Sequence, residues 1–354
     1  MNHPFETLLQ KKVQETFGPG GRLISLAPLA GDASSRRYYR GCLEGERVPQ
    51  TLIVMELAGS NLPLSSEELA IFNEPLAELP FLNLHRFLTR LGVRVPSLYG
   101  QWVTEGILFL EDLGDLSLWD AVQDLPIEEA SRWYEKAIDQ LLRIQIQGTR
   151  AREDACVAFR QRFDFRLYMW EFEHFLEYGP GEEKLTPAQK QLLIQSFQQI
   201  AGRLDRQTPY LNHRDYHSWN LMVHREEIAV IDFQDALLAP LQYDLASLLN
   251  DRETDRVIGP AVERRLLDYY LERKGEMEGP QPNRDEFLEI YLFSAIQRDL
   301  KVVGRFHYLD RVKGKPGYKK YIPPTLRRLK RNLQRLPTMG KVLEVLAEHF
   351  AEIR

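Results

Sequence analysis

A cluster of polar residues between short apolar runs, from Leu211 to Asp244, constrains this chain more than any other stretch. It reads LNHRDYHSWNLMVHREEIAVIDFQDALLAPLQYD and contains His213, Asp215 and Asn220 in the order H-x-D-x-x-x-x-N. A second Asp, Asp232, follows the apolar run AVI. Four residues that agree in type, order and spacing indicate one site rather than scattered surface polarity.

The apolar residues within this stretch predict a β-hairpin. Residues 220–224 and 230–231 have the composition of two short strands, and the polar residues 225–227 between them are typical of a turn. Such a hairpin would hold the side chains of Asp215, Asn220 and Asp232 at one mouth.

These residue types fit phosphoryl transfer, in which the protein mainly positions the reactants and neutralises charge. Asp215 would orient and deprotonate an acceptor hydroxyl, and Asn220 and Asp232 would supply oxygen ligands to Mg²⁺. His213 would brace the loop rather than react. A plainer interpretation is that H-x-D is commonplace and that Asp232 merely ends a strand, but the I-D-F triplet that closes the set favours the catalytic one.

The segments HRDYHSWN and VIDFQDA resemble the aminoglycoside phosphotransferase and choline kinase superfamily of small-molecule kinases. The resemblance implies an α+β, bilobal, protein-kinase-like fold with ATP and Mg²⁺ as cofactors. Residues 1–112 would form a small β-rich N-lobe that binds the nucleotide. Residues 113–354 would form a larger, mainly helical C-lobe with the catalytic loop and the acceptor site.

Within this superfamily the chain is most similar to the bacterial kinases that phosphorylate the anomeric hydroxyl of N-acetylmuramate and N-acetylglucosamine. GDASSRRYYR resembles their phosphate-covering turn, and QRDLKVVGRFHYLDRVKGKPGYKKYIPP resembles their C-terminal part. The implied reaction is transfer of the γ-phosphoryl group to an amino sugar, in cell-wall recycling.

The first hundred residues predict the strands of the N-lobe, at residues 21–29, 36–43, 51–57, 98–102 and 106–111. The turn at residues 30–35 would cover the phosphates, because backbone N–H groups and small hydroxyls can approach closely there. In this interpretation Ser34, Ser35 and Arg37 contact the nucleotide phosphates. Backbone groups near Glu111 and Leu113, in LFLEDLGD, would meet the adenine edge.

One departure from the kinase pattern concerns the third strand, where protein kinases place a phosphate-binding Lys. This chain has no Lys between Lys12 and Lys136, and Met55 or Glu56 stands at the expected position. Either an Arg of the second strand replaces the Lys, or nucleotide binding is weak or absent. The candidates are Arg36, Arg37 and Arg40, each of which also fits a solvated strand face.

The rest of the chain predicts helices, at residues 81–91, 127–146, 187–204, 243–249 and 284–308. A capping box at Ser65-Ser66-Glu67-Glu68 predicts a further helix start. Asp244 is placed to anchor its helix against the catalytic loop.

The acceptor is expected between the catalytic loop and the helix that begins near Arg284. His217, Gln234 and Asp235 would hydrogen-bond sugar hydroxyls, and Arg298 and Lys301 would meet a carboxylate or an acetamido oxygen. From residue 301 to residue 335 there are twelve Lys or Arg against one acid. This basic segment favours a neutral or anionic acceptor over a cationic one.

Three other functions compete with the sugar kinase. An acidic acceptor cleft would suit an aminoglycoside or choline kinase, and the acidic remainder of the chain permits one. The missing Lys suggests a catalytically inactive nucleotide-binding scaffold, although a scaffold has no chemical need for Asp215, Asn220 and Asp232 together. The basic segment suggests RNA binding, but the net charge of −5 argues against a nucleic-acid partner.

Composition places the chain among cytoplasmic globular proteins. Its 354 residues are 44% hydrophobic and 27% charged, which suits two lobes with a large core. Cys42 and Cys156 cannot form a framework of disulfides. Because no signal-peptide pattern or membrane-length apolar run occurs, we expect no membrane partner. The sequence does not indicate an oligomeric state.

Overall fold

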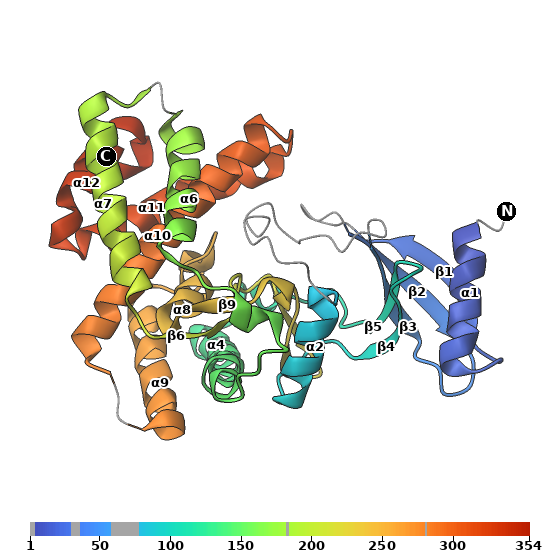
Figure 1. Ribbon diagram of the computed structural model, residues 1–354. Coiled ribbons are helices and arrows are strands. Elements are labelled where there is room, and N and C mark those ends of the chain that lie inside the picture. The colour runs from blue at the N-terminus through green and yellow to red at the C-terminus, as the bar shows by residue number, and fades with distance from the viewer. Residues whose placement is uncertain (1–3, 30–35, 58–77, 182–183, 280–281) are drawn as a thin grey trace.

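Five antiparallel strands form a sheet at one end of the molecule, in the order β1-β2-β3-β5-β4 (Figure 1). The structure is a computed structural model, and it describes residues 4–29, 36–57, 78–181, 184–279 and 282–354. The expected phosphate turn at residues 30–35 and the expected capping box at residues 65–68 lie outside the described residues. The strands are β1 Arg22–Pro28, β2 Arg37–Glu44, β3 Thr51–Glu56, β4 Leu98–Trp102 and β5 Ile107–Glu111.

The two faces of this sheet pack against different partners, because side chains alternate along each strand. One face packs against helix α1 (Pro4–Phe17) in a small core that includes Leu52, Val54 and Phe109. The other face, with Met55 and Leu108, joins the main core of the protein. Figure 1 shows α1 on the side of the sheet that is turned away from the helical body.

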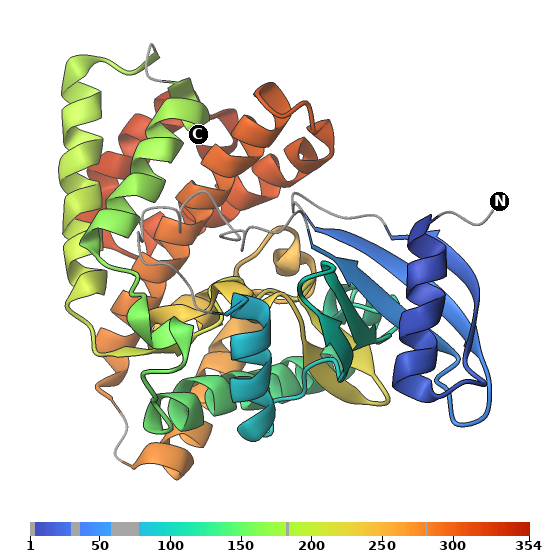
Figure 2. The same ribbon diagram turned by 45° about the vertical axis from the view of Figure 1, so that its right-hand side comes forward.

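Helix α2 (Pro80–Arg90) lies between the sheet and the helical body (Figure 2). Pro80 stands in the first turn of the helix, where a backbone N–H has no partner within the helix, so the absence of an N–H in proline costs no hydrogen bond. The Phe81 ring stacks on the Phe233 ring with centroids 5.0 Å apart. This contact ties α2 to the segment that follows Asp232.

The helical body is built around α10 (Arg284–Arg311), which packs against α6, α8 and α11. Asn283 caps this helix by accepting the backbone N–H groups of Asp285 and Glu286. The other helices are α3 Leu118–Val122, α4 Ile127–Leu142, α5 Gly148–Arg150, α6 Phe165–Leu176, α7 Pro187–Asp205, α8 Leu241–Leu249, α9 Pro260–Glu278, α11 Ile322–Gln334 and α12 Gly340–His349.

Two short antiparallel pairs carry the polar cluster. They are β6 (Pro209–Asn212) with β9 (Leu237–Pro240), and β7 (Leu221–His224) with β8 (Glu227–Val230). The second pair confirms the predicted hairpin. Arg225 and Glu226 both have positive φ, 50° and 63°, as a two-residue type I′ turn requires.

The predicted N-lobe strands are confirmed to within one or two residues, and so is the division into a small β-rich part and a larger helical part. The helix expected at residues 127–146 ends as an α-helix at Leu142 and continues as a π-helical turn over residues 143–147. In the described ranges, no helix is long and apolar enough to cross a membrane.

Candidate active site

The loop after β6 is fixed by a buried carboxylate. Asp244, at the start of α8, accepts the backbone N–H groups of His213 and Arg214. Arg214 has a φ of 82°, so these bonds hold the backbone in a left-handed conformation that a non-glycine residue rarely adopts. Burial raises the pKa of Asp244 to about 6 against the opposing effect of His213. Asp244 therefore anchors the loop, as the sequence indicated.

His213 is 1% exposed, and its Nε2 lies 2.8 Å from the carbonyl oxygen of Ile231. This contact joins the loop to the residue that precedes Asp232. A ring held in this way braces two segments against each other, which is the role expected for His213.

The hairpin brings Asn220 and Asp232 to the same end of the site. The backbone N–H of Ile231 donates to the carbonyl of Asn220 over 3.1 Å, so Asp232 follows directly beyond the paired residues. The Nδ2 of Asn220 donates to the carbonyl of Asp215 over 3.0 Å. Because the amide nitrogen is turned toward Asp215, the amide oxygen of Asn220 is the group left for a cation.

Asp232 adopts a left-handed conformation, with φ 62° and ψ 34°, and its side chain is exposed. Gln234 donates from Nε2 to Oδ1 of Asp232 over 2.7 Å. One exposed carboxylate and one amide oxygen fit Mg²⁺, which binds few protein ligands and keeps oxygens from water and phosphate. Within the described part of the chain, no group of three or more His, Cys, Asp or Glu could hold a metal by itself.

Asp215 is surrounded by cations. Arg298, on α10, donates from Nη1 to Oδ1 of Asp215 over 3.3 Å and to the carbonyl of Arg214 over 3.1 Å. Burial would raise the pKa of Asp215, but Lys301, Arg298 and Arg214 outweigh it and hold this pKa well below its usual range. Asp215 is therefore a fixed, ionised and weak base.

The two cations that were expected to meet the acceptor are engaged with carboxylates of this chain. Arg298 is 2% exposed and lies between Asp215 and Asp251, whose Oδ1 is 3.8 Å from its Nη2. Lys301 lies 3.0 Å from Oε1 of Glu171, a residue that is 1% exposed. The geometry favours a role for both cations in setting the charge and position of Asp215.

The polar residues expected to bind sugar hydroxyls lie at different depths. His217 is buried, and burial lowers its pKa to about 4, so its ring is neutral at physiological pH. Gln234 is buried and holds Asp232. Asp235 is partly exposed in the short 3₁₀ turn Phe233–Asp235. Of these three residues, His217 lies nearest to Asp215 in sequence, and it contributes to the lowered pKa of Asp215.

The arginines of the second strand divide between the two sheet faces. Arg37 pairs with Glu56 at 2.6 Å, and Tyr39, which packs against α1, donates to the same carboxylate. Arg37 therefore points away from the helical body. Arg40, on the opposite face, pairs with Asp112 at 2.7 Å and Asp115 at 2.8 Å.

Arg36 is 5% exposed and precedes the strand on the face of Tyr38 and Met55. Burial raises the pKa of the Tyr38 phenol, whereas Arg36 lowers it through its charge and a hydrogen bond, and Asp232 raises it again. Arg36 and Asp232 thus act on the same hydroxyl. Among the three candidates, Arg36 is the cation that lies toward Asp232.

The expected adenine-binding segment is held by polar contacts. The Glu111 carboxylate accepts from Arg94 at 2.6 Å and from the backbone N–H of Ser97 at 3.0 Å. Burial would raise the pKa of Glu111, but Arg94 and Ser97 lower it to about 2. The carbonyl of Leu113 lies 3.1 Å from Nδ1 of His224. Ser34 and Ser35, expected at the phosphates, are outside the described residues.

Sequence reasoning missed three residues that contribute to the site. They are Glu171, which pairs with Lys301, and Asp251 and Arg252, which follow α8. Glu171 lies within an aromatic-rich helix, and the other two lie in a loop without a motif. The charge of Glu171 among aromatic residues could have marked it, whereas Asp251 and Arg252 stand in the charged stretch NDRETDR, where a charge gives no such signal.

Comparison with known proteins agrees with this geometry. Residues 25–282 match the family described as the phosphotransferase enzyme family. The chain belongs to that family. It is an enzyme that transfers a phosphoryl group to a hydroxyl.

Curated relatives extend along most of the chain. It is 29% identical to the N-acetylmuramate/N-acetylglucosamine kinase of Pseudomonas aeruginosa over 91% of this chain and 88% of that protein. It is 29% identical to the kinase of the same name from Pseudomonas putida over 93% of this chain and 90% of that protein. The kinase of the same name from Caulobacter vibrioides is 28% identical over 83% of this chain and 84% of that protein.

Solved structures show the same fold. An ADP-bound aminoglycoside phosphotransferase, APH(2'')-Ib, matches with a TM-score of 0.58 and 14% identity, over 92% of this chain and 97% of that one. Choline kinase LicA from Streptococcus pneumoniae matches with a TM-score of 0.57 and 14% identity, over 94% of this chain and 98% of that one. The protein-kinase-like fold expected from the sequence is confirmed.

Proposed function

We propose that this phosphotransferase uses Mg²⁺ and ATP to phosphorylate the anomeric hydroxyl of an amino sugar, N-acetylmuramate or N-acetylglucosamine. The observation that carries this proposal is the placement of Asp215 among Arg298, Lys301 and Arg214, beside Asn220. The names of the curated relatives point to the same acceptors.

The residues of the loop divide the work. Asp215 would accept a hydrogen bond from the acceptor hydroxyl and orient its oxygen toward the γ-phosphorus. It would take up the hydroxyl proton as the new P–O bond forms and the bond from the γ-phosphorus to the β–γ bridging oxygen breaks, which releases ADP. Asn220 and Asp232 would hold Mg²⁺, which supplies charge neutralisation to the nucleotide phosphates. Arg36 would stand in for the absent third-strand Lys. The nucleotide would bind to residues 1–112, and the acceptor to residues 113–354.

The weak basicity of Asp215 bears on the choice of acceptor. An anomeric hydroxyl is more acidic than an ordinary sugar alcohol, so a base of low pKa suffices for it. A primary alcohol gives up its proton less readily. The cations around Asp215 therefore support an anomeric acceptor over choline or a sugar primary hydroxyl.

A cationic acceptor is the second candidate, because the matching structures include aminoglycoside and choline kinases. Those structures are 14% identical to this chain, whereas the curated relatives, at 29% identity, are named as amino-sugar kinases. The cationic acceptor is therefore the weaker alternative.

Purified protein with ATP and Mg²⁺ should be assayed for ADP release with N-acetylmuramate, N-acetylglucosamine, choline and kanamycin. The expected result is turnover of an amino sugar, with a phosphorus–proton coupling at the anomeric position of the product by NMR. Preferred turnover of choline or kanamycin, or phosphate on the primary hydroxyl, would contradict the proposal.

A further inference from the structure

Arg252, outside the catalytic loop, has an unusual backbone conformation. Its φ is 41°, in the left-handed region that residues other than glycine rarely adopt. Arg214 and Asp232 share this conformation within the site, and Arg225 and Glu226 form the hairpin turn. Arg252 lies apart from them in sequence, in the loop that follows α8. A strained residue of this kind persists only where its surroundings fix it, which is common at functional sites.

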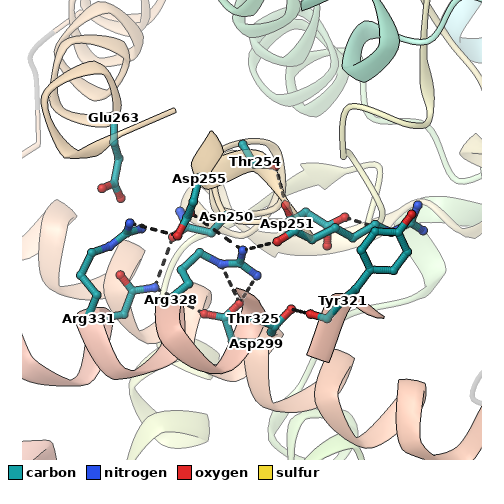
Figure 3. A network of polar contacts seen from close by, with 12 residues as sticks. Asn250, Asp251, Thr254, Asp255, Glu263, Asp299, Tyr321, Thr325, Arg328 and Arg331 are labelled. Atoms are coloured by element: carbon teal, nitrogen blue, oxygen red, sulfur yellow. Dashed lines mark hydrogen bonds and ion pairs between the residues drawn. The ribbon is translucent and has the colours of Figure 1, made fainter. Parts of the chain in front are cut away.

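A buried arginine on α11 supports this conformation. Arg328 is 1% exposed and donates from Nη1 to the carbonyl of Arg252 over 2.9 Å. It also donates to Asp299 of α10 from Nε at 3.0 Å and from Nη2 at 2.7 Å. Figure 3 shows Arg328 between Asp299 and the loop that contains Asp251, Thr254 and Asp255. The loop is thereby tied to two helices of the C-terminal half.

The side chain of Arg252 is directed toward the catalytic loop. Its guanidinium carbon lies 4.6 Å from the ring centroid of Trp219 and 5.5 Å from that of Tyr321. Trp219 directly precedes Asn220, and its ring stacks on Trp119 at 5.0 Å. Aromatic faces on two sides fix the plane of the guanidinium.

The guanidinium has donors to spare. Its nearest carboxylate atom is Oδ2 of Asp251, 3.6 Å from Nε, which is beyond hydrogen-bond distance. Among the described residues it donates no hydrogen bond from its side chain. The two terminal amino groups form a planar fork that matches a carboxylate in bidentate fashion.

Other polar atoms in this region are also buried and unsatisfied. Nδ1 of His217, Oδ2 of Asp251 and Nε of Arg298 have no hydrogen-bond partner among the described residues. The pKa of His217 is raised by the charges of Asp251 and Asp215 and lowered by those of Arg252 and Arg298. Buried polar atoms normally have partners, so these atoms are open to hydrogen bonds from water or from a polar ligand.

We propose that Arg252 is a specificity-determining residue that binds a carboxylate substituent of the acceptor sugar, with Trp219 and His217 as its neighbours. The inference rests on the proposed function and narrows it to sugars that carry an acidic group. N-acetylmuramate differs from N-acetylglucosamine by a lactyl ether that carries such a group. The carboxylate would meet the fork of Arg252 while the anomeric hydroxyl faces Asp215.

The test compares acidic and neutral sugars in equilibrium binding to the full chain with Mg·ADP present. Two pairs serve as probes: N-acetylmuramate with N-acetylglucosamine, and glucuronate with glucose. The wild type should bind the acid of each pair more tightly. Arg252→Gln should weaken binding of the acid about ten-fold or more and leave the neutral sugar within about two-fold, because a charged hydrogen bond is lost.

Two further variants separate recognition from folding. Arg252→Gly introduces a residue that adopts positive φ freely, so the loop should stay intact. This variant should lose the preference for the acidic sugar as Arg252→Gln does. Arg256→Gln removes an exposed cation four residues away and should leave the preference unchanged. Equal binding of acid and neutral sugar by the wild type, retention of the preference by either Arg252 variant, or its loss in Arg256→Gln would overturn the proposal.

Turnover tests the underlying function separately. If the wild type phosphorylates neither amino sugar, the proposed reaction is wrong, while the binding comparison still decides the role of Arg252. Wild-type protein that binds none of the four sugars overturns the assignment of Arg252 as well.

Discussion

Arg298 donates a hydrogen bond from Nη1 to Oδ1 of Asp215 over 3.3 Å, and the same nitrogen holds the carbonyl of Arg214. Asp215 is thus fixed to α10, a helix distant from it in sequence. Because Arg298 is buried, its charge acts on Asp215 with little screening by solvent. Arg298 therefore fixes the position of Asp215 and, together with Lys301 and Arg214, lowers its affinity for a proton.

Removing this cation should change the pH dependence of the reaction. In Arg298→Met the ionised form of Asp215 loses a stabilising charge, so its pKa rises. Because the wild-type pKa of Asp215 is held well below its usual range, kcat/KM measured from about pH 4 to pH 9 should show no acid limb from this group, whereas the Met variant should lose activity toward the acid end of that range. Arg298→Lys keeps a charge and should lose less. An unchanged profile in the Met variant would show that Arg298 does not set the basicity of Asp215.

Asp215 itself should be required for chemistry and not for nucleotide binding. Asp215→Asn keeps the shape of the side chain but cannot take up the acceptor proton, so turnover should fall to background. Calorimetry should find the affinity for Mg·ATP within a few-fold of the wild type. Loss of nucleotide binding in this variant would indicate that Asp215 serves the metal or the fold instead.

Asp232, unlike Asp215, should be required for nucleotide binding, because its exposed carboxylate is the charged ligand expected on Mg²⁺. Asp232→Ala should weaken Mg·ATP binding and abolish activity together. Raising the Mg²⁺ concentration should recover part of the nucleotide binding. A normal Mg²⁺ dependence in the variant would remove Asp232 from the metal site.

The neighbours Arg36 and Arg37 provide a matched pair for the phosphate contact. Arg36→Met should raise the KM for ATP about ten-fold or more, because a charged hydrogen bond to phosphate contributes about 1.5–3 kcal/mol. Arg37→Met removes an exposed cation that pairs with Glu56 on the other sheet face, and it should leave this KM within about two-fold. Equal effects of the two substitutions would contradict the assignment.

Local patterns predicted most of the architecture. Apolar runs bounded by turn residues predicted the strands of the sheet, and two short apolar runs around the polar residues 225–227 predicted the hairpin between Asn220 and Asp232. The start of α10 was predicted at Arg284, where Asn283 caps the helix, while its end at Arg311 lies three residues beyond the predicted one. Each of these features depends on residues close together in the sequence.

Features that depend on distant partners could not be predicted. The sequence shows that Lys301 is charged but not that Glu171 lies against it. Likewise, the sequence offers Arg36, Arg37 and Arg40 equally, and only packing against α1 decides which sheet face each occupies. Arg252 could not be identified from its sequence neighbours, because the contact that supports its conformation comes from Arg328, far along the chain.

The pair of Arg328 and Asp299 leads to a prediction about stability. Both side chains are 1% exposed, so Arg328→Met leaves a buried carboxylate without its cation and should lower the free energy of unfolding by about 3–5 kcal/mol. The exposed neighbour Arg327→Met is the matched control and should change it by less than about 0.5 kcal/mol. Urea unfolding monitored by circular dichroism measures both values. The double variant Arg328→Met, Asp299→Leu should recover much of the loss, because it removes the unpaired charge together with its partner. A single Arg328 variant as stable as the wild type would show that this buried pair does not hold the loop of Arg252 in place.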